Sequence, residues 1–156
     1  MSKYEIYTDG STRKNGAKDA IGGWAYAIYR DGVLVDHDSG VELNTTNQRM
    51  ELTAAIKALC NSAEMTYVEG GDCIVFSDSA YLVNCYQQQW WINWNKNGWI
   101  NSKKQPVANR ELWEQLIPDF KNPHITFKKV KGHADDMRNN FVDKLAQEAS
   151  AGGKDE

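Results

Sequence analysis

The sequence predicts an α/β fold, with a mixed five-stranded sheet of three antiparallel strands followed by two parallel additions, flanked by helices. Strand-like patterns fill the first 42 residues, and strand and helix patterns alternate after them. The pair Asp31-Gly32 lies between two apolar segments, as in a tight hairpin. Because a helical crossover makes the strands that it joins parallel, we expect the later strands beside the first.

The first three strands follow from alternation and from one turn. Residues 3–8 alternate between apolar and polar side chains, and residues 21–30 and 33–42 flank Asp31-Gly32. That pair tolerates the positive φ angles of a type I′ turn, which matches the twist of antiparallel strands. These segments therefore predict an antiparallel three-stranded opening.

The remaining elements follow from periodicity. Thr45 and Gln48 have the spacing of a capping box ahead of a helical apolar pattern. The continuous apolar segment CIVFS is typical of a strand buried on both faces. In chain order, we expect a helix over 46–61, a strand over 73–77, a helix over 79–89, an irregular segment over 90–106, a helix over 109–117, a strand over 124–130 and a helix over 139–150. Residues 1–150 then form a single domain, and residues 151–156 a flexible tail.

Composition indicates an ordinary globular domain of 156 residues, 41% hydrophobic and 25% charged. No apolar run approaches the roughly 18 residues of a membrane span, and the first residues lack the apolar stretch of a secretory signal. We therefore expect a cytoplasmic protein without membrane association. With no conspicuous assembly motif, we expect a monomer without an obligate protein partner. The three cysteines lack C-x-x-C spacing, which predicts reduced packing residues rather than disulfides or a zinc site.

Charge is distributed unevenly along the chain. Residues 90–131 carry eight Lys or Arg against three Asp or Glu, a balance of +5, which leaves −8 for the remainder of a chain whose net charge is −3. The same segment holds five of the six tryptophans. A cationic segment rich in large aromatic side chains favours a ligand that is large, flat or anionic, although the net charge of −3 argues against indiscriminate binding of nucleic acid.

Four acidic residues occupy positions where a carboxylate is costly. Asp9 and Asp78 each follow a predicted strand, at the sheet edge where α/β folds bind ligands. Taken alone, either of them is better explained as a turn residue or a helix cap. Glu51 and Asp143 lie on the apolar stripes of their helices, which should face the sheet.

Converging carboxylates repel one another unless cations hold them together. Oxygen ligands without cysteine or clustered histidine favour hard ions such as Mg²⁺ or Mn²⁺. The four acids therefore predict a divalent-metal site.

The segments YTDGS, NQRMEL, FSDS and VKGH, with an Asp ten residues after His133, resemble the catalytic core of the type 1 ribonuclease H family, the bacterial ribonuclease HI proteins. The resemblance runs from Lys3 to about Ala149 and implies a ribonuclease H-like fold. It also implies endonucleolytic hydrolysis of the RNA strand of RNA–DNA hybrids by two metal ions, giving 5′-phosphate and 3′-hydroxyl ends. It places His133 in a mobile loop, suited to proton transfer or product release. The metal-binding carboxylates that it implies are Asp9, Glu51, Asp78 and Asp143.

The resemblance also implies two sets of substrate contacts. Those beside the RNA strand are Gly10, Thr12, Asn47 and Gln48. Those on a basic protrusion that grips the DNA strand are Trp90, Trp94, Trp113, Lys96, Lys103 and Lys104. The residue types leave alternatives open, because Trp99 and Trp113 suit a hydrophobic core equally well and clustered lysines can simply solubilise a loop.

The match to the family is incomplete. Gln48 replaces a common Asn, and Ala80 stands where many members have Gln or Met, so contacts at these positions are open.

Two other functions fit part of the pattern. A transposase- or integrase-like nuclease acting on DNA is disfavoured by the small size and the absence of flanking DNA-binding domains. A non-catalytic hybrid-binding module is disfavoured by the acids, which would only repel phosphates.

Overall fold

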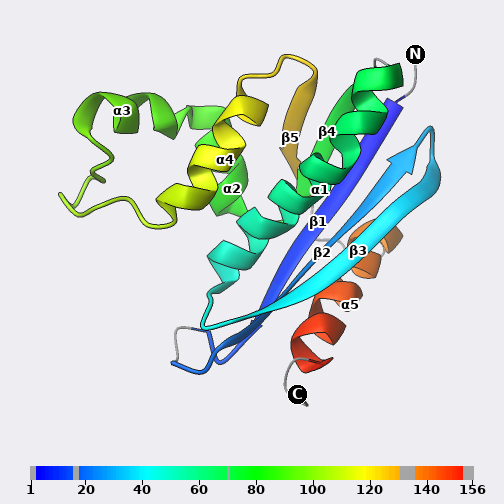
Figure 1. Ribbon diagram of the computed structural model, residues 1–156, viewed down its shortest axis with the longest axis horizontal. Helices are drawn as coiled ribbons and strands as arrows, with labels where there is room; N and C mark the ends of the chain where they lie inside the picture. Colours follow the sequence, from blue (N-terminus) through cyan, green and yellow to red (C-terminus); the bar gives the residue numbers. More distant parts are fainter. Residues whose placement is uncertain (1–2, 16–17, 70, 131–135, 153–156) are drawn as a thin grey trace.

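The computed structural model of the chain describes residues 3–15, 18–69, 71–130 and 136–152. Its elements alternate much as the sequence predicts (Figure 1). In chain order they are β1 (Lys3–Arg13), β2 (Ile21–Arg30), β3 (Val33–Leu43), α1 (Asn47–Glu69), β4 (Asp72–Ser77), α2 (Ala80–Gln88), α3 (Trp90–Asn97), α4 (Arg110–Phe120), β5 (Ile125–Lys129) and α5 (Met137–Gly152).

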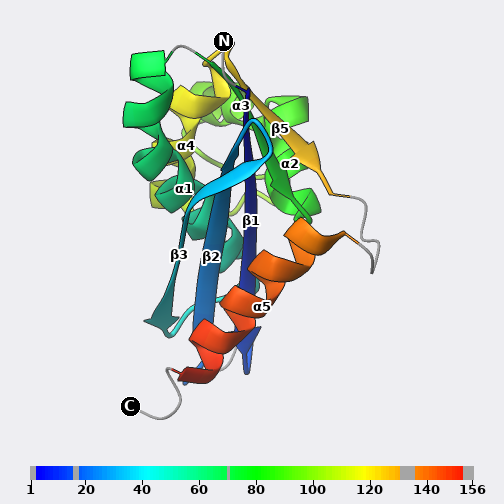
Figure 2. The ribbon, with the colours of Figure 1, turned by 90° about the vertical axis from the view of Figure 1, so that its right-hand side faces the viewer.

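The five strands form one mixed sheet in the order β3-β2-β1-β4-β5. The pairs β1–β2 and β2–β3 are antiparallel, whereas β1–β4 and β4–β5 are parallel. Helices α1 and α5 cover opposite faces of the sheet (Figure 2). The predicted fold class is therefore confirmed. The hairpin is confirmed as well, since Asp31 and Gly32 have φ angles of 49° and 86°.

Each face of the sheet has its own hydrophobic core. The larger core lies under α1, α2 and α4 and includes Tyr4, Ile6, Tyr26, Val75, Trp113 and Phe127. The smaller core lies under α5 and includes Tyr7, Ala25, Ala27, Val142 and Ala146. Cys73 and Cys85 are buried, but Cys60 is exposed, so the packing role expected of Cys60 is wrong. Among the described helices, none combines the length and the apolar character needed to span a membrane.

Several elements differ in extent from the prediction, and one helix was not predicted. Helix α1 continues to Glu69, and α5 continues to Gly152, so residues 151 and 152 are helical rather than part of a tail. Residues 90–97 form α3 inside the segment predicted to be irregular. Its apolar face is short, with Trp91 buried and Trp90 and Trp94 packed against the larger core. The helix ends where Gly98 adopts a left-handed φ of 79°.

The start of α1 also differs from the expected capping box. The helix begins at Asn47, so its cap is Thr46, whose side-chain oxygen accepts the backbone N–H of Arg49 at 3.2 Å. Thr45 is one residue too early to cap, and its hydroxyl is buried without a hydrogen-bond partner.

Close packing of α5 on β2 depends on Gly23. A Cβ atom there would lie 2.2 Å from the backbone oxygen of Ala146 and 2.8 Å from the backbone nitrogen of Ser150. Because backbone atoms cannot move aside individually, we expect Gly23→Ala to lower the free energy of unfolding by roughly 3 kcal/mol. Gly98→Ala is the control, since its Cβ meets nothing within 4 Å and costs only the positive φ, roughly 1 kcal/mol. Equal urea midpoints for the two variants would rule out this packing.

Candidate active site

Three carboxylates from distant parts of the chain meet at one edge of the sheet. Asp9 comes from β1, Glu51 from α1 and Asp78 from the residue after β4, and each offers an oxygen within 4.8 Å of the others. The parallel pairing of β1 with β4 ends at Thr8 and Ser77, so the next residue of each chain segment is one of these acids. We call Asp9, Glu51 and Asp78 the acid cluster.

Two features of the local backbone bring the acids together. The sequence suggested that Asp9 follows the end of the first strand. Strand β1 instead continues to Arg13, so Asp9 lies inside it. Gly10 lets the start of α1 pack directly on β1, because a Cβ there would lie 2.7 Å from the backbone nitrogen of Glu51. Gly10 was expected to allow close approach of RNA, and in the structure it allows close approach of the helix that carries Glu51.

Burial and mutual repulsion shift the titration of the cluster. Asp9 and Glu51 are buried, with only 2% and 8% of their surface exposed. Burial, the negative charge of Asp78 and a hydrogen bond with Asp143 raise the pKa of Asp9 to about 8. Burial and then the charges of Asp9 and Asp78 raise the pKa of Glu51 well above its ordinary value.

The buried oxygens have fewer partners than carboxylates require. Asp9 Oδ1 accepts the backbone N–H of Gly10 at 2.9 Å, but Asp9 Oδ2 and Glu51 Oε2 are buried without a hydrogen-bond partner. Buried carboxylate oxygens are normally paired or bound to a cation. An all-oxygen donor set with unpaired atoms turned into one cluster fits a hard divalent cation.

Asp143 is not one of the three acids of this cluster, although its carboxylate lies close enough to Asp9 to raise the pKa of Asp9. Asp143, on α5, is half-buried, and both of its carboxylate oxygens accept hydrogen bonds from Gln147 Nε2, at 3.3 and 3.2 Å. Sequence reasoning missed Gln147, although its spacing of four residues from Asp143 on a helix was a usable signal. His133 lies outside the described residues.

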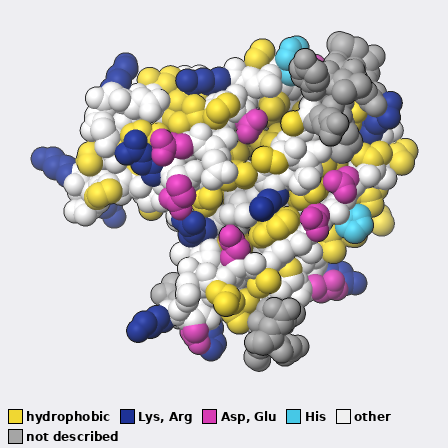
Figure 3. All heavy atoms as spheres, in the orientation of Figure 1, with side chains coloured by type: hydrophobic (Ala, Val, Ile, Leu, Met, Phe, Trp, Pro, Cys, Tyr) yellow, Lys and Arg dark blue, Asp and Glu magenta, His cyan; other side chains and the backbone are white. Residues whose placement is uncertain are grey.

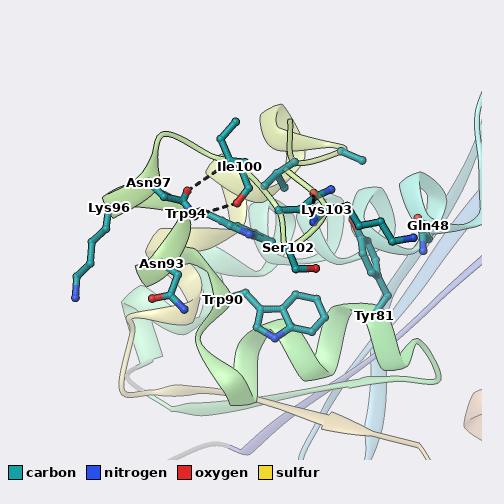
Figure 4. Close-up of a pocket in the computed structure, with 13 residues that line it drawn as sticks. Gln48, Tyr81, Trp90, Asn93, Trp94, Lys96, Asn97, Ile100, Ser102 and Lys103 are labelled. Atoms are coloured by element: carbon teal, nitrogen blue, oxygen red, sulfur yellow. Dashed lines mark hydrogen bonds between the residues drawn. The ribbon is translucent and has the colours of Figure 1, made fainter. Parts of the chain in front are cut away.

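A pocket of about 1000 Å³ lies in the lobe that α3 forms with the segment after it (Figure 4). In the surface view this lobe projects from the body of the protein, with basic side chains at its tip and a hollow below it (Figure 3). The predicted contacts that line the pocket are Gln48, Trp90, Trp94, Lys96 and Lys103. Residues that line it without having been predicted include Tyr81, Asn93, Asn97 and Asn101.

The structure separates the remaining predicted substrate contacts from this pocket. Trp113 is completely buried and its indole N–H donates to the Tyr81 hydroxyl at 3.2 Å, so the direct ligand contact predicted for Trp113 is wrong. Trp113 supports the pocket wall from behind. Lys104 is exposed but does not line the pocket. Thr12, whose hydroxyl is buried and unpaired, and Asn47, whose backbone N–H donates to Asn15 Oδ1, also lie outside the pocket wall.

Comparisons with known proteins were made by sequence and by structure. The sequence model of the RNase H family matches residues 1–151. A ribonuclease H of Moorella thermoacetica is 45% identical over 152 residues, covering 97% of this chain and 93% of the relative. A ribonuclease H of Clostridium botulinum strain Hall is 41% identical, with 96% of each chain covered.

Two solved structures illustrate the similarity in fold. LC9-RNase H1, described as a type 1 RNase H with the type 2 active-site motif, has a TM-score of 0.73 and 26% identity, covering 96% of this chain and 72% of that chain. LC11-RNase H1, solved in complex with an RNA/DNA hybrid, has a TM-score of 0.69 and 22% identity, covering 97% of this chain and 99% of that chain. The second likeness is one of fold alone.

Proposed function

The chain belongs to the RNase H family, whose members are hydrolases acting on phosphodiester bonds, and from this premise we propose that it cleaves the RNA strand of RNA–DNA hybrids. The observation that carries the proposal is the acid cluster at the edge of the sheet, with buried oxygens that lack partners. The hybrid bound by LC11-RNase H1 supports the choice of substrate class. As part of the same proposal, residues 1–150 act as one monomeric domain.

The metal that the family uses fits the residues present. Asp9, Glu51 and Asp78 would hold the divalent ions, with Asp143 as the fourth ligand, and Mg²⁺ or Mn²⁺ suits their oxygen atoms. When bound, two such ions supply electrostatic stabilisation to the attacking and leaving oxygens of an in-line phosphodiester displacement.

The chain's own residues control access to this site and move protons beside it. The buried positions of Asp9 and Glu51 exclude water from one side of the cluster, while the exposed Asp78 leaves the other side open to a phosphate. Attack by water on the phosphorus, with the 3′ oxygen of the preceding nucleotide leaving, gives 5′-phosphate and 3′-hydroxyl ends. His133 is proposed to transfer a proton in the reaction, because the imidazole of free histidine titrates close to neutral pH.

The lysine-lined pocket is proposed to hold the DNA strand. Trp90 and Trp94 offer aromatic faces, and Lys96 and Lys103 offer cations for backbone phosphates. Discrimination between RNA and DNA at the cut strand then rests on the 2′-hydroxyl.

We expect the double substitution Lys96→Ala and Lys103→Ala to weaken hybrid binding with little change in kcat. Loss of two phosphate contacts should reduce the slope of log K against log salt concentration by about 2. The measurement is hybrid binding by fluorescence anisotropy over a range of salt concentrations. The control removes the same charge outside the pocket, through Lys121→Ala and Lys128→Ala. A control that lowers the slope equally would mean that the lysines act only through net charge.

The proposed function is tested by incubating the protein with labelled RNA–DNA hybrid, duplex RNA and duplex DNA, each with Mg²⁺ and with EDTA. We expect Mg²⁺-dependent cutting of the RNA strand in the hybrid alone, with 3′-hydroxyl ends. Preferential cutting of duplex DNA would favour a transposase- or integrase-like nuclease instead. Binding of the hybrid without cutting would favour a non-catalytic module.

A further inference from the structure

Arg49 connects the helix of the acid cluster to the start of α4. It lies on α1, two residues before Glu51, and is half-buried. Its Nη1 atom donates to Asn109 Oδ1 at 3.1 Å and to Glu111 Oε1 at 2.5 Å. These partners are 60 and 62 residues away in the sequence, where α1 and α4 lie side by side (Figure 1).

The connection continues from Asn109 into the wall of the pocket. Asn109 Nδ2 donates to the hydroxyl of Tyr81 at 3.4 Å, and the same hydroxyl accepts the indole N–H of Trp113 at 3.2 Å. Tyr81 lines the pocket and contacts the ring of Trp90 edge-on, with 6.3 Å between ring centroids. One side chain of α1 is thus linked to the aromatic wall of the pocket through two intervening residues.

The conformation of Asn109 shows that this connection takes precedence over helix capping. Asn109 is the residue before α4, where an Asn side chain normally accepts a backbone N–H of the first helical turn. It makes no such bond, and it adopts a left-handed φ of 63°, a conformation that Asn tolerates better than most residues other than glycine. Its amide oxygen instead accepts a hydrogen bond from Arg49, and its amide nitrogen donates one to Tyr81.

Stability alone does not account for Arg49. Glu111 has a side chain that is 60% exposed, and ion pairs with such a partner contribute only about 0–1 kcal/mol. The first turn of α1 also carries Gln48, which lines the same pocket. The position of the pocket relative to the acid cluster is therefore set where α1 meets α4.

We propose that Arg49 is a positioning residue that fixes the spacing between the acid cluster and the pocket, and so aligns the cut RNA strand with the bound DNA strand. This inference rests on the proposed function. A hybrid long enough to contact both places gains affinity from the pocket only when that spacing is correct. The affinity of a hybrid too short to reach the pocket does not depend on that spacing.

The test compares wild-type protein with Arg49→Met, which keeps most of the stem and removes the donors, on hybrids of increasing length. On long hybrids we expect KM to rise roughly three- to tenfold, equivalent to about 0.7–1.4 kcal/mol of binding, with kcat within twofold. On hybrids too short to reach the pocket we expect both parameters to match the wild type. Cut positions along a long hybrid should also become less defined.

Tyr81→Phe provides a second variant, because it keeps the aromatic ring and removes only the hydroxyl that Asn109 and Trp113 contact. It should show the same dependence on length with a smaller change. Arg138→Met is the matched control, since Arg138 is similarly half-buried and pairs with Glu5 at 3.1 Å, outside the pocket wall. It should leave the dependence on length unchanged.

The outcomes separate the two proposals. If the wild-type protein cuts no hybrid of any length, the proposed function fails. If it cuts hybrids but Arg49→Met changes KM equally at every length, or changes kcat alone, the positioning role is wrong and the proposed function stands.

Discussion

Asp9→Asn is expected to lower hybrid cleavage by at least about a thousandfold while hybrid binding persists. Asparagine keeps the shape of the side chain but removes the negative charge that the cluster would present to divalent ions, and several kcal/mol of transition-state stabilisation depend on such ions. Binding should survive because the pocket lies apart from Asp9. Cleavage is measured with excess Mg²⁺ on a labelled hybrid, and binding by anisotropy in EDTA.

Asp119→Asn is the matched control for this substitution. Asp119 is a half-buried acid on α4 whose pKa burial raises to about 6, but it lies outside the acid cluster. Its replacement should leave cleavage within about twofold of the wild type. Full activity in Asp9→Asn would remove Asp9 from the proposed mechanism, and equal losses in the two variants would point to a general effect on folding.

In the absence of metal, the protein is expected to lose stability as pH rises from about 4 to about 8. The pKa of Asp9 rises from 3.8 in its ordinary state to about 8 in the fold, so the folded state binds the proton more tightly than the unfolded chain. Stability from this group is complete below pH 3.8 and is lost as pH approaches 8. One pKa unit corresponds to about 1.4 kcal/mol, or roughly 3–6 °C in Tm for a chain of this size.

The most informative window is pH 6 to 8, because Asp119, whose pKa is raised to about 6, is already half ionised at pH 6 and adds little to the change above it. In EDTA we expect Tm to fall by more than about 3 °C across this window. Asp9→Asn should flatten the slope and raise Tm at pH 8, and Mg²⁺ should raise the wild-type Tm more at pH 8 than at pH 6. A wild-type Tm that is constant in EDTA would show that burial and the charge of Asp78 do not raise the pKa of Asp9.

Much of the fold follows from local signals. Asp31-Gly32 determines the hairpin through two positive φ angles, and the apolar segment CIVFS determines the central position of β4. Glu51 and Asp143 were recognisable because the apolar neighbours on their helices would bury them. Asp9 and Asp78 were recognisable because each follows a predicted strand at the same edge of the sheet. Their convergence follows from the parallel pairing of β1 with β4, which the crossover through α1 enforces.

The missed features depend on contacts between distant residues. Helix α3 is only eight residues long, so the apolar face formed by Trp90, Trp91 and Trp94 is a weak signal in the sequence. Its buried side chain, Trp91, packs against Phe120 of another helix. The burial of Trp113, by contrast, had a local signal, because Leu116 and Phe120 follow it at helical spacing and are buried on the same helix. The bridge from Arg49 to Asn109 joins residues 60 positions apart and leaves no periodic trace.

The central physical claim is that the acid cluster is stable because divalent ions neutralise it. The most direct measurement is a crystal structure of the wild-type protein with Mn²⁺ and hybrid, with the ions located by anomalous scattering. We predict Mn²⁺ within about 2.0–2.6 Å of carboxylate oxygens of Asp9, Glu51 and Asp78. Ordered Mn²⁺ only at other positions, with these three side chains paired to protein donors instead, would contradict the claim.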